Sequence, residues 1–179
     1  MILIIKTNSE RLHDLEFVKP IEKILEKNKI KFKTIHYSEL KEKHLKKAKK
    51  IILTGTSLKD NKFLEDIREF SWIRFFDKPI LGICSGMQII SLAFDSELRQ
   101  KIEIGFYPEN FTKEFLSLNR GENQVYHLHN NYAILPYNFE NFTNSEIPQA
   151  IKHKFLPVYG ILFHPEVRNE ELIVRFCEL

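Results

Sequence analysis

Residues 79–88 read PILGICSGMQ, and this segment is the clearest indication of the fold. Its apolar run from Pro79 to Ile83 is typical of a buried strand, and the run from Gly86 to Phe94 has the pattern of a helix. Between them lies Gly-x-Cys-x-Gly, centred on Cys84. This is the cysteine form of the nucleophile elbow, a tight strand-to-helix turn that presents a nucleophile at the end of a central strand.

The neighbours of Cys84 suit such a turn. Gly82 and Gly86 leave room where side chains would clash with the adjoining strand and helix. A cysteine at a helix N-terminus feels the positive end of the helix dipole, which favours the thiolate form. The backbone N–H of Ser85 can stabilise a developing oxyanion there. The alternative is a small apolar residue closing a core strand, because free cysteine is often buried.

Apolar strands alternate with amphipathic helices on both sides of the elbow. The expected strands are Ile2–Lys6, Ile30–His36, Lys50–Thr54 and Pro79–Ile83. The expected helices are Glu10–Asn28, Tyr37–Ala48, Phe63–Phe76 and Gly86–Phe94. This order predicts an α/β fold with a mostly parallel central sheet, helices on both faces, and the chemistry at the carboxyl ends of the strands.

The pattern changes after Ile102, where short β-like runs are broken by Pro, Asn and Gly. These runs are Ile102–Phe106, Gln124–Leu128, Tyr132–Leu135, Gln149–His153 and Val158–Phe163. We expect smaller antiparallel β extensions here, followed by a final helix over Asn169–Cys177. The length suits one domain over residues 1–179, and no linker divides the chain.

A thiol nucleophile needs a base and a group that orients the base. His164 follows the apolar run Tyr159–Phe163, so we expect it at the carboxyl end of a strand. Pro165 makes the chain turn there, and the carboxylate of Glu166 can then accept a hydrogen bond from the imidazole. A lone histidine at a strand end is usually structural, but together with the elbow cysteine it predicts a catalytic pair.

The two motifs carry a family resemblance. Residues 79–88 resemble the nucleophile motif of the class I glutamine amidotransferases, and Tyr159–Val167 resembles their His-x-Glu motif. Within that family, Gly-Met-Gln after Cys84 and the run Ala150–His153 resemble the separate glutaminase subunit of GMP synthetase, although Gly-Met-Gln also occurs in the histidine-biosynthesis amidotransferase. The resemblance implies a class I glutamine amidotransferase-like, flavodoxin-like fold.

The resemblance also implies a glutaminase reaction. Cys84 would attack the carboxamide of L-glutamine, with His164 as base and then acid and Glu166 completing a triad. The N–H groups of Gly55 and Ser85 would hold the oxyanion. The residues implied to contact the substrate are Gly86, Gln88, His129 and Asn130. No cofactor is implied. Because no ATP-binding loop is visible, the resemblance implies that ammonia passes to a separate synthetase subunit, with GMP synthetase as the nearest example.

The sequence departs from this family in three places. The loop Thr54–Leu58 carries one Gly where the family has Gly-Gly-Pro. Leu162 stands where a Gln is usual, and Asn130 replaces the Asp of a His-Gly-Asp segment. Two alternatives stay open. The first is a hydrolase of γ-glutamyl compounds or small peptides on the same scaffold, which fits the absence of a fused synthetase. The second is a non-catalytic regulatory subunit, which the shortened loop at Gly55 favours.

The composition and charge of the chain bear on whether it binds nucleic acid or a membrane. The net charge is +3, and the lysine-rich stretch from Lys19 to Lys50 indicates a solvated helix face rather than a nucleic-acid site, because no aromatic platform is interleaved with it. No apolar run approaches the ~20 residues of a membrane helix, and no signal segment is visible. We therefore expect no nucleic-acid or membrane partner and a cytoplasmic location.

Cys177, His127 and His129 lie outside the two motifs. A reducing compartment predicts free thiols at both cysteines, with Cys177 in the core. His127 and His129 alternate on one strand face and resemble metal ligands. No third ligand with matching spacing is visible, so we expect no metal site.

Overall fold

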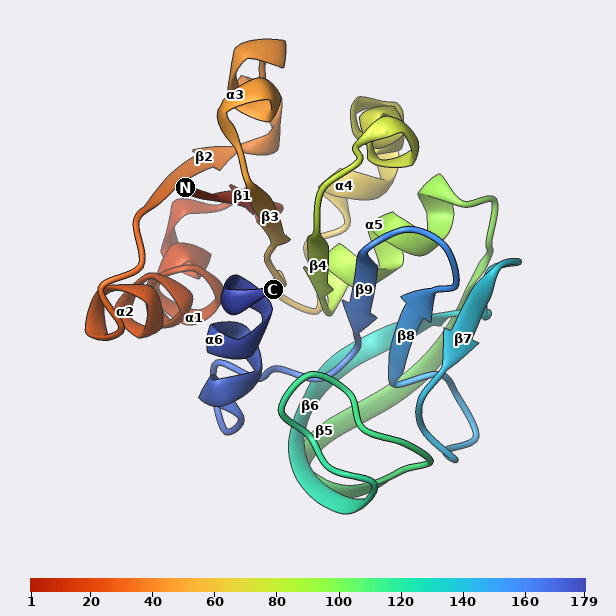
Figure 1. Cartoon of the computed structure of the whole chain (residues 1–179). Helices are drawn as coiled ribbons and strands as arrows, with labels where there is room; N and C mark the ends of the chain where they lie inside the picture. Colours follow the sequence, from red (N-terminus) through yellow and green to blue (C-terminus); the bar gives the residue numbers. More distant parts are fainter.

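The computed structural model describes residues 1–179, which are built around a seven-stranded sheet of order β2-β1-β3-β4-β9-β8-β7 (Figure 1). The strands are β1 Ile2–Lys6, β2 Phe32–His36, β3 Lys50–Leu53, β4 Ile80–Ile83, β7 Phe139–Asn141, β8 Ala150–His153 and β9 Val158–Ile161. The five strands from β2 to β9 pair in parallel, and β8 and β7 add antiparallel neighbours at one edge. The predicted α/β fold is confirmed.

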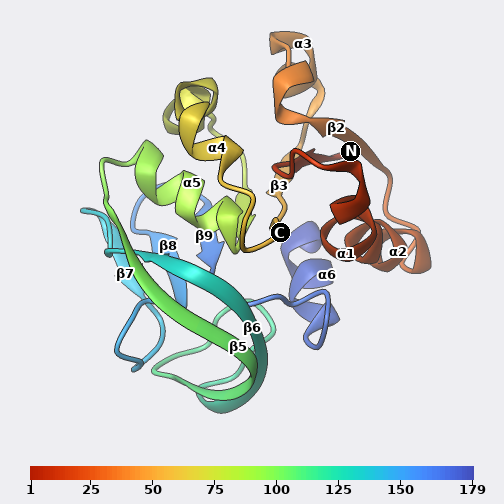
Figure 2. The same ribbon diagram turned by 180° about the vertical axis from the view of Figure 1, so that it is seen from behind.

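Helices cover both faces of this sheet (Figures 1 and 2). One face carries α1 (Asp14–Phe17), α2 (Lys19–Lys27) and α6 (Glu170–Glu178), and the other carries α4 (Lys62–Glu65), the 3-10 helix η3 (Ile67–Phe75) and α5 (Ser85–Ala93). Side chains alternate along β1, so that Ile2 and Ile4 join the first cluster while Leu3 and Ile5 join the second. A parallel sheet buried on both faces requires such continuous apolar strands.

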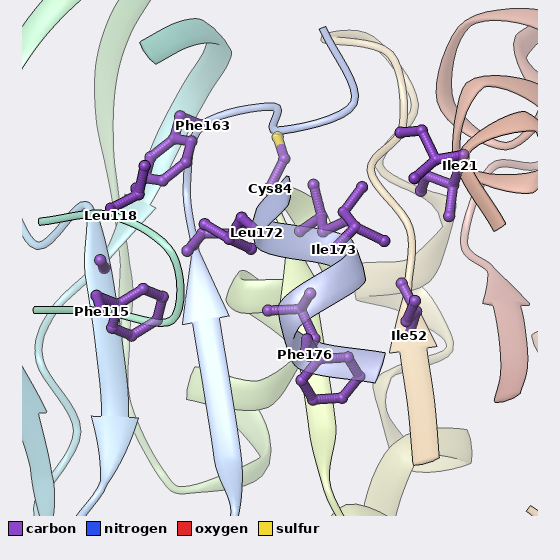
Figure 3. Packing of buried hydrophobic residues seen from close by; sticks show 14 of the residues in the cluster. Ile21, Ile52, Cys84, Phe115, Leu118, Phe163, Leu172, Ile173 and Phe176 are labelled. Carbon is purple, nitrogen blue, oxygen red and sulfur yellow. The ribbon is translucent and has the colours of Figure 1, made fainter. Parts of the chain in front are cut away.

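The helix α6 packs against one face of the sheet. Its Leu172, Ile173 and Phe176 are fully buried and belong to the same cluster as Ile52 of β3 (Figure 3). Each buried side chain of this size contributes about 1.5–3 kcal/mol. Figure 3 also shows Cys84 at the margin of this cluster, with its sulfur directed away from α6. Cys84 is itself a buried member of this cluster, so the same packing supports the end of β4 where the thiol lies.

A long hairpin forms a second, two-stranded antiparallel sheet from β5 (Leu98–Phe111) and β6 (Gly121–Ala133). The runs expected at Gln124–Leu128 and Tyr132–Leu135 are largely parts of this single strand β6. Its odd-numbered residues from Val125 to His129 are buried. In Figures 1 and 2 the hairpin curves below the ends of β4 and β9. The hairpin thus becomes one wall of the space beyond these strands.

Three expected helices are shorter than predicted. The segment Glu10–Asn28 divides into η1 (Arg11–His13), α1 and α2, because Pro20 lies in the first turn of α2, where its missing N–H is tolerated. The other two segments divide into η2 (Tyr37–Glu39) with α3 (Glu42–Lys47), and α4 with η3. None of the helices combines the length and the apolar character needed to cross a membrane.

Candidate active site

The elbow at Cys84 has a strained backbone. Cys84 adopts φ 51° and ψ −107° between β4 and α5, a conformation that side-chain-bearing residues rarely take and that costs about 1–3 kcal/mol. Its N–H donates to the carbonyl of Ile161 in β9 at 2.8 Å, and its carbonyl accepts from the N–H of Gln88 at 3.1 Å. These two bonds fix the residue at the junction, with the start of α5 beside it.

The paired glycines allow α5 to approach the sheet closely. A Cβ on Gly86 would lie 2.5 Å from the carbonyl oxygen of Leu53 in β3. A Cβ on Gly82 would lie 2.5 Å from the backbone of Gly86. Both contacts are with backbone atoms, so neither neighbour can yield by turning a side chain. The close contact between α5 and the sheet therefore requires glycine at both positions 82 and 86, as the elbow motif predicted.

His164 and Glu166 form a buried pair on the turn after β9. Nδ1 of His164 lies 2.7 Å from Oε1 of Glu166, and both side chains are almost fully buried. The N–H of His164 donates to the carbonyl of Tyr126 in β6 at 2.8 Å, and the Phe17 ring packs 5.5 Å from the imidazole. Burial alone would lower the pKa of His164, but the charges of Glu166 and Cys84 raise it well above the ordinary value.

Gly55 lies where the thiol and the imidazole approach each other. A Cβ on this residue would lie 2.7 Å from Cε1 of His164 and 3.4 Å from Cβ of Cys84. Nε2 of His164 is buried and has no hydrogen-bond partner in the protein. The Cys84 thiol donates to the carbonyl of Leu128 at 3.6 Å. The structure thus brings together the residues predicted from two distant motifs, with Gly55 between them.

The thiol opens on a narrow cleft lined by residues from segments 56–63, 84–88 and 128–130. Gln88 lies on this lining, and its side chain donates to the carbonyl of Asn131 at 2.8 Å. Asn130 reaches across the cleft and donates to the carbonyl of Leu58 at 2.8 Å. Ser85 and His129 also line it. Gly86 packs against β3 instead, and Gly55 lies beside His164.

Comparison with known proteins agrees with this architecture. The family description "Glutamine amidotransferase class-I" matches residues 12–175. The chain belongs to this family. It is 35% identical over 121 residues to a glutamine-hydrolyzing GMP synthase subunit of Methanosarcina barkeri, an alignment that covers 62% of this chain and 64% of the relative. The corresponding subunit of Pyrococcus furiosus is 34% identical over 140 residues, or 70% of each chain.

Solved structures share the amidotransferase fold. A putative GMP synthase subunit from Thermoplasma acidophilum superposes with a TM-score of 0.85 at 22% identity, over 99% of this chain and 92% of that one. A glutamine amidotransferase from Thermotoga maritima gives 0.72 at 20% identity, over 99% and 81%. The chain spans less than two thirds of the length of the first curated relatives it matches, 64% and 60% for two of them.

Two buried polar residues, Thr7 beside the elbow and Asp60 in the loop that lines the cleft, were not singled out from sequence. Oγ1 of Thr7, just beyond β1, lies 3.0 Å from Oγ of Ser85 and donates to the carbonyl of Thr54 at 3.0 Å. Asp60 accepts from the N–H of Ser9 at 2.7 Å and from Oγ1 of Thr56 at 2.9 Å. A polar residue directly after a buried strand is the sequence signal that marks Thr7, whereas Asp60 lies further along the loop after β3 and carries no such signal.

The structure places a third potential ligand beside His127 and His129, which the spacing of residues in the sequence did not reveal. The third residue is Glu103, which pairs directly with His129 across the hairpin. Nε2 of His129 lies 3.0 Å from Oε2 of Glu103 and 3.3 Å from Nδ1 of His127. Burial and the neighbouring His127 lower the pKa of His129 to about 3. Although His129 lines the cleft, its Nε2 is engaged with this cluster.

Proposed function

We propose that the chain, acting as one domain over residues 1–179, hydrolyses L-glutamine to glutamate and ammonia. The observation that carries this proposal is the strained Cys84 at the end of β4, placed beside the buried His164–Glu166 pair. Cys84 would then be the nucleophile, His164 the base and Glu166 the carboxylate that orients the base, which are the three groups that this kind of hydrolysis needs. The family membership and the names of the relatives support the same reaction.

In the first half-reaction the Cys84 thiol gives its proton to His164, and the sulfur attacks the carboxamide carbon of glutamine. The oxyanion accepts hydrogen bonds from the N–H groups of Ser85 and Gly55; the first N–H groups of a helix have no partner within the helix, so that of Ser85 is available. His164 protonates the departing nitrogen, and ammonia leaves a glutamyl thioester on Cys84. The proton on His164 is stabilised by Glu166, 2.7 Å from Nδ1.

In the second half-reaction water enters where ammonia left. His164, now neutral, accepts a proton from that water, and the hydroxide attacks the thioester carbonyl. Glutamate departs when the C–S bond breaks, and the proton returns to the sulfur. Gln88 and Asn130 lie on the cleft wall with amide groups suited to the amino and carboxylate ends of the substrate.

We further propose that the ammonia is used by a separate synthetase subunit. The relatives named as glutamine-hydrolyzing GMP synthase subunits support a partner of this kind, with GMP formation as the first reaction to test. Mixing the chain with a candidate synthetase should raise glutamate release and couple it to product formation. Glutamate release that no synthetase changes, together with faster cleavage of γ-glutamyl peptides, would favour the hydrolase alternative.

The experiment for the reaction itself compares the two cysteines. Cys84→Ala should abolish glutamate release from glutamine. Cys177→Ala is the matched control and should retain it, because Cys177 lies in α6, where burial raises the pKa of its thiol to about 12 and keeps it protonated. Full activity in Cys84→Ala would overturn the proposal. A folded wild-type chain that never releases glutamate, even with the synthetase, would favour a regulatory subunit.

A further inference from the structure

The inner face of the β5–β6 hairpin carries a cluster that the glutaminase reaction does not use. Its members are Glu103 of β5 with His127 and His129 of β6. Both imidazoles are fully buried, and the Glu103 side chain is 19% exposed. Buried polar groups cost free energy unless they find partners, so three such groups facing one point need an explanation.

The spacing of the three atoms fits a metal ion. Oε2 of Glu103 lies 3.0 Å from Nε2 of His129 and 3.7 Å from Nδ1 of His127, and the two ring nitrogens are 3.3 Å apart. Ligands at about 2.0–2.1 Å from a tetrahedral Zn²⁺ are separated by about 3.3 Å. The three separations lie around this value, so an ion bonded to all three atoms fits between them with small adjustments.

Hydrogen bonds among these three atoms satisfy them less completely than a bound cation would. A single proton on Nε2 of His129 can point at Glu103 or at Nδ1 of His127, but it cannot form a linear bond with both. A cation accepts electron pairs from all three atoms at once. Imidazole nitrogen with carboxylate oxygen is also a donor set that divalent transition metals prefer, whereas Mg²⁺ and Ca²⁺ favour oxygen ligands.

Two residues outside the cluster, Glu109 and Gln149, face its ligands. Nε2 of His127, on the far side of the ring, lies 3.2 Å from Oε1 of Glu109, close enough for charge attraction although the two atoms are not aligned as a hydrogen bond. That carboxylate favours a proton on Nε2 and so leaves the Nδ1 lone pair directed at the cluster. The side chain of Gln149 donates to Oε2 of Glu103 at 2.7 Å and holds that carboxylate in place.

From this geometry we infer that Glu103, His127 and His129 bind a divalent transition metal of the Zn²⁺ class. The ion joins β5 to β6 directly behind Leu128, whose carbonyl accepts from the Cys84 thiol. It therefore fixes the wall of the cleft without touching the reacting atoms. This role is independent of glutamine hydrolysis.

The test is a calorimetric titration of Zn²⁺ into the full-length chain after it has been stripped with a chelator. Wild-type protein should bind one ion per chain, and the ion should raise the melting temperature. Co²⁺ in its place should give the visible absorption of a four-coordinate nitrogen and oxygen site. The titration is repeated in Cys84→Ala, which should bind equally well because its thiol is not a ligand.

Two variants and one control locate the site. Glu109→Gln should weaken Zn²⁺ binding about 10–100-fold, the usual effect of removing a group that orients a ligand. Glu103→Gln should weaken it further, whereas Glu122→Gln, exposed on the outer face of β6, should not. If Glu103→Gln fails to fold, the Zn²⁺ affinity of Glu109→Gln still tests whether the cluster binds the ion. Wild-type protein without a stoichiometric site, unchanged affinity in Glu109→Gln, or loss of binding in Cys84→Ala would overturn the inference.

Discussion

Gly55 and His164 lie so close that a methyl group on Gly55 would be 2.7 Å from Cε1 of the imidazole ring. The only glycine of the loop after β3 is therefore the residue that leaves room for the proposed base. The Gly-Gly-Pro loop of the family is not needed to make room for the imidazole, because a single glycine at position 55 leaves enough space.

This contact predicts the effect of Gly55→Ala. The ring of His164 must move away from Cys84, and misplacement of a catalytic group by about 1 Å lowers activity about 100-fold. Steady-state kinetics should show that loss in kcat/KM for glutamine while the fold survives. The contrasting variant is Gly121→Ala, which has open space but φ +105°, so it should lower the melting temperature and leave kcat/KM unchanged. Normal activity in a folded Gly55→Ala would contradict the geometry.

Glu166→Gln tests how the imidazole is held. The amide keeps the shape but removes the charge that raises the pKa of His164, so kcat should fall about 10²- to 10⁴-fold. Glu170→Gln, on the exposed first turn of α6, is the control and should retain activity. Equal activity in the two variants would mean that Glu166 does not support the base.

The same pair makes stability depend on pH. The pKa of His164 is raised in the folded chain, so the stability contributed by its protonated form is fully present below about pH 6.5 and is lost as pH rises through the raised value. Denaturation by urea should therefore show the largest difference between wild type and Glu166→Gln in acid. A difference that grows toward alkaline pH would contradict this sign.

Asp60 should stabilise the loop that lines the cleft. Burial raises the pKa of this carboxyl, but bonds from Ser9, Thr56 and Lys62 outweigh burial and lower it overall. Asp60→Asn should cost about 2 kcal/mol at pH 7, because hydrogen bonds to a charged group are the stronger kind. The cost should persist above about pH 3.9 and shrink as pH falls through the lowered pKa.

The control for that measurement is Asp95→Asn. Asp95 is exposed and pairs with Arg74 at the surface, so its replacement should change the free energy of unfolding by less than about 0.5 kcal/mol. Urea titrations of both variants from pH 3 to pH 7 compare them directly. Equal costs at every pH would show that the carboxylate of Asp60 is not stabilised by its three donors.

Local sequence signals predicted the sheet and the cysteine turn well. The apolar run before Cys84 and its flanking glycines are short-range features, and the structure places them as a strand, a strained turn and a helix. His164 and Glu166 are only two residues apart, so their pairing also follows from a turn at Pro165. These features depend on few long-range contacts.

Long-range pairing explains what the sequence did not reveal. Glu103 meets His129 because the hairpin has that register, with an irregularity between Gln100 and Glu103 that alternation of residue types does not show. A slip of one residue would turn the carboxylate to the opposite face. The Phe63–Phe76 segment also divides into α4 and η3, although the spacing of its apolar residues predicted one helix.

The most direct measurement is labelling of the chain with a glutamine analogue that carries an electrophilic ketone in place of the carboxamide. We expect one label per chain, located on Cys84 by peptide mass spectrometry, prevented by excess glutamine and lost in His164→Ala. Labelling of Cys177 to the same extent, or labelling of Cys84 that neither glutamine nor the loss of His164 affects, would contradict it.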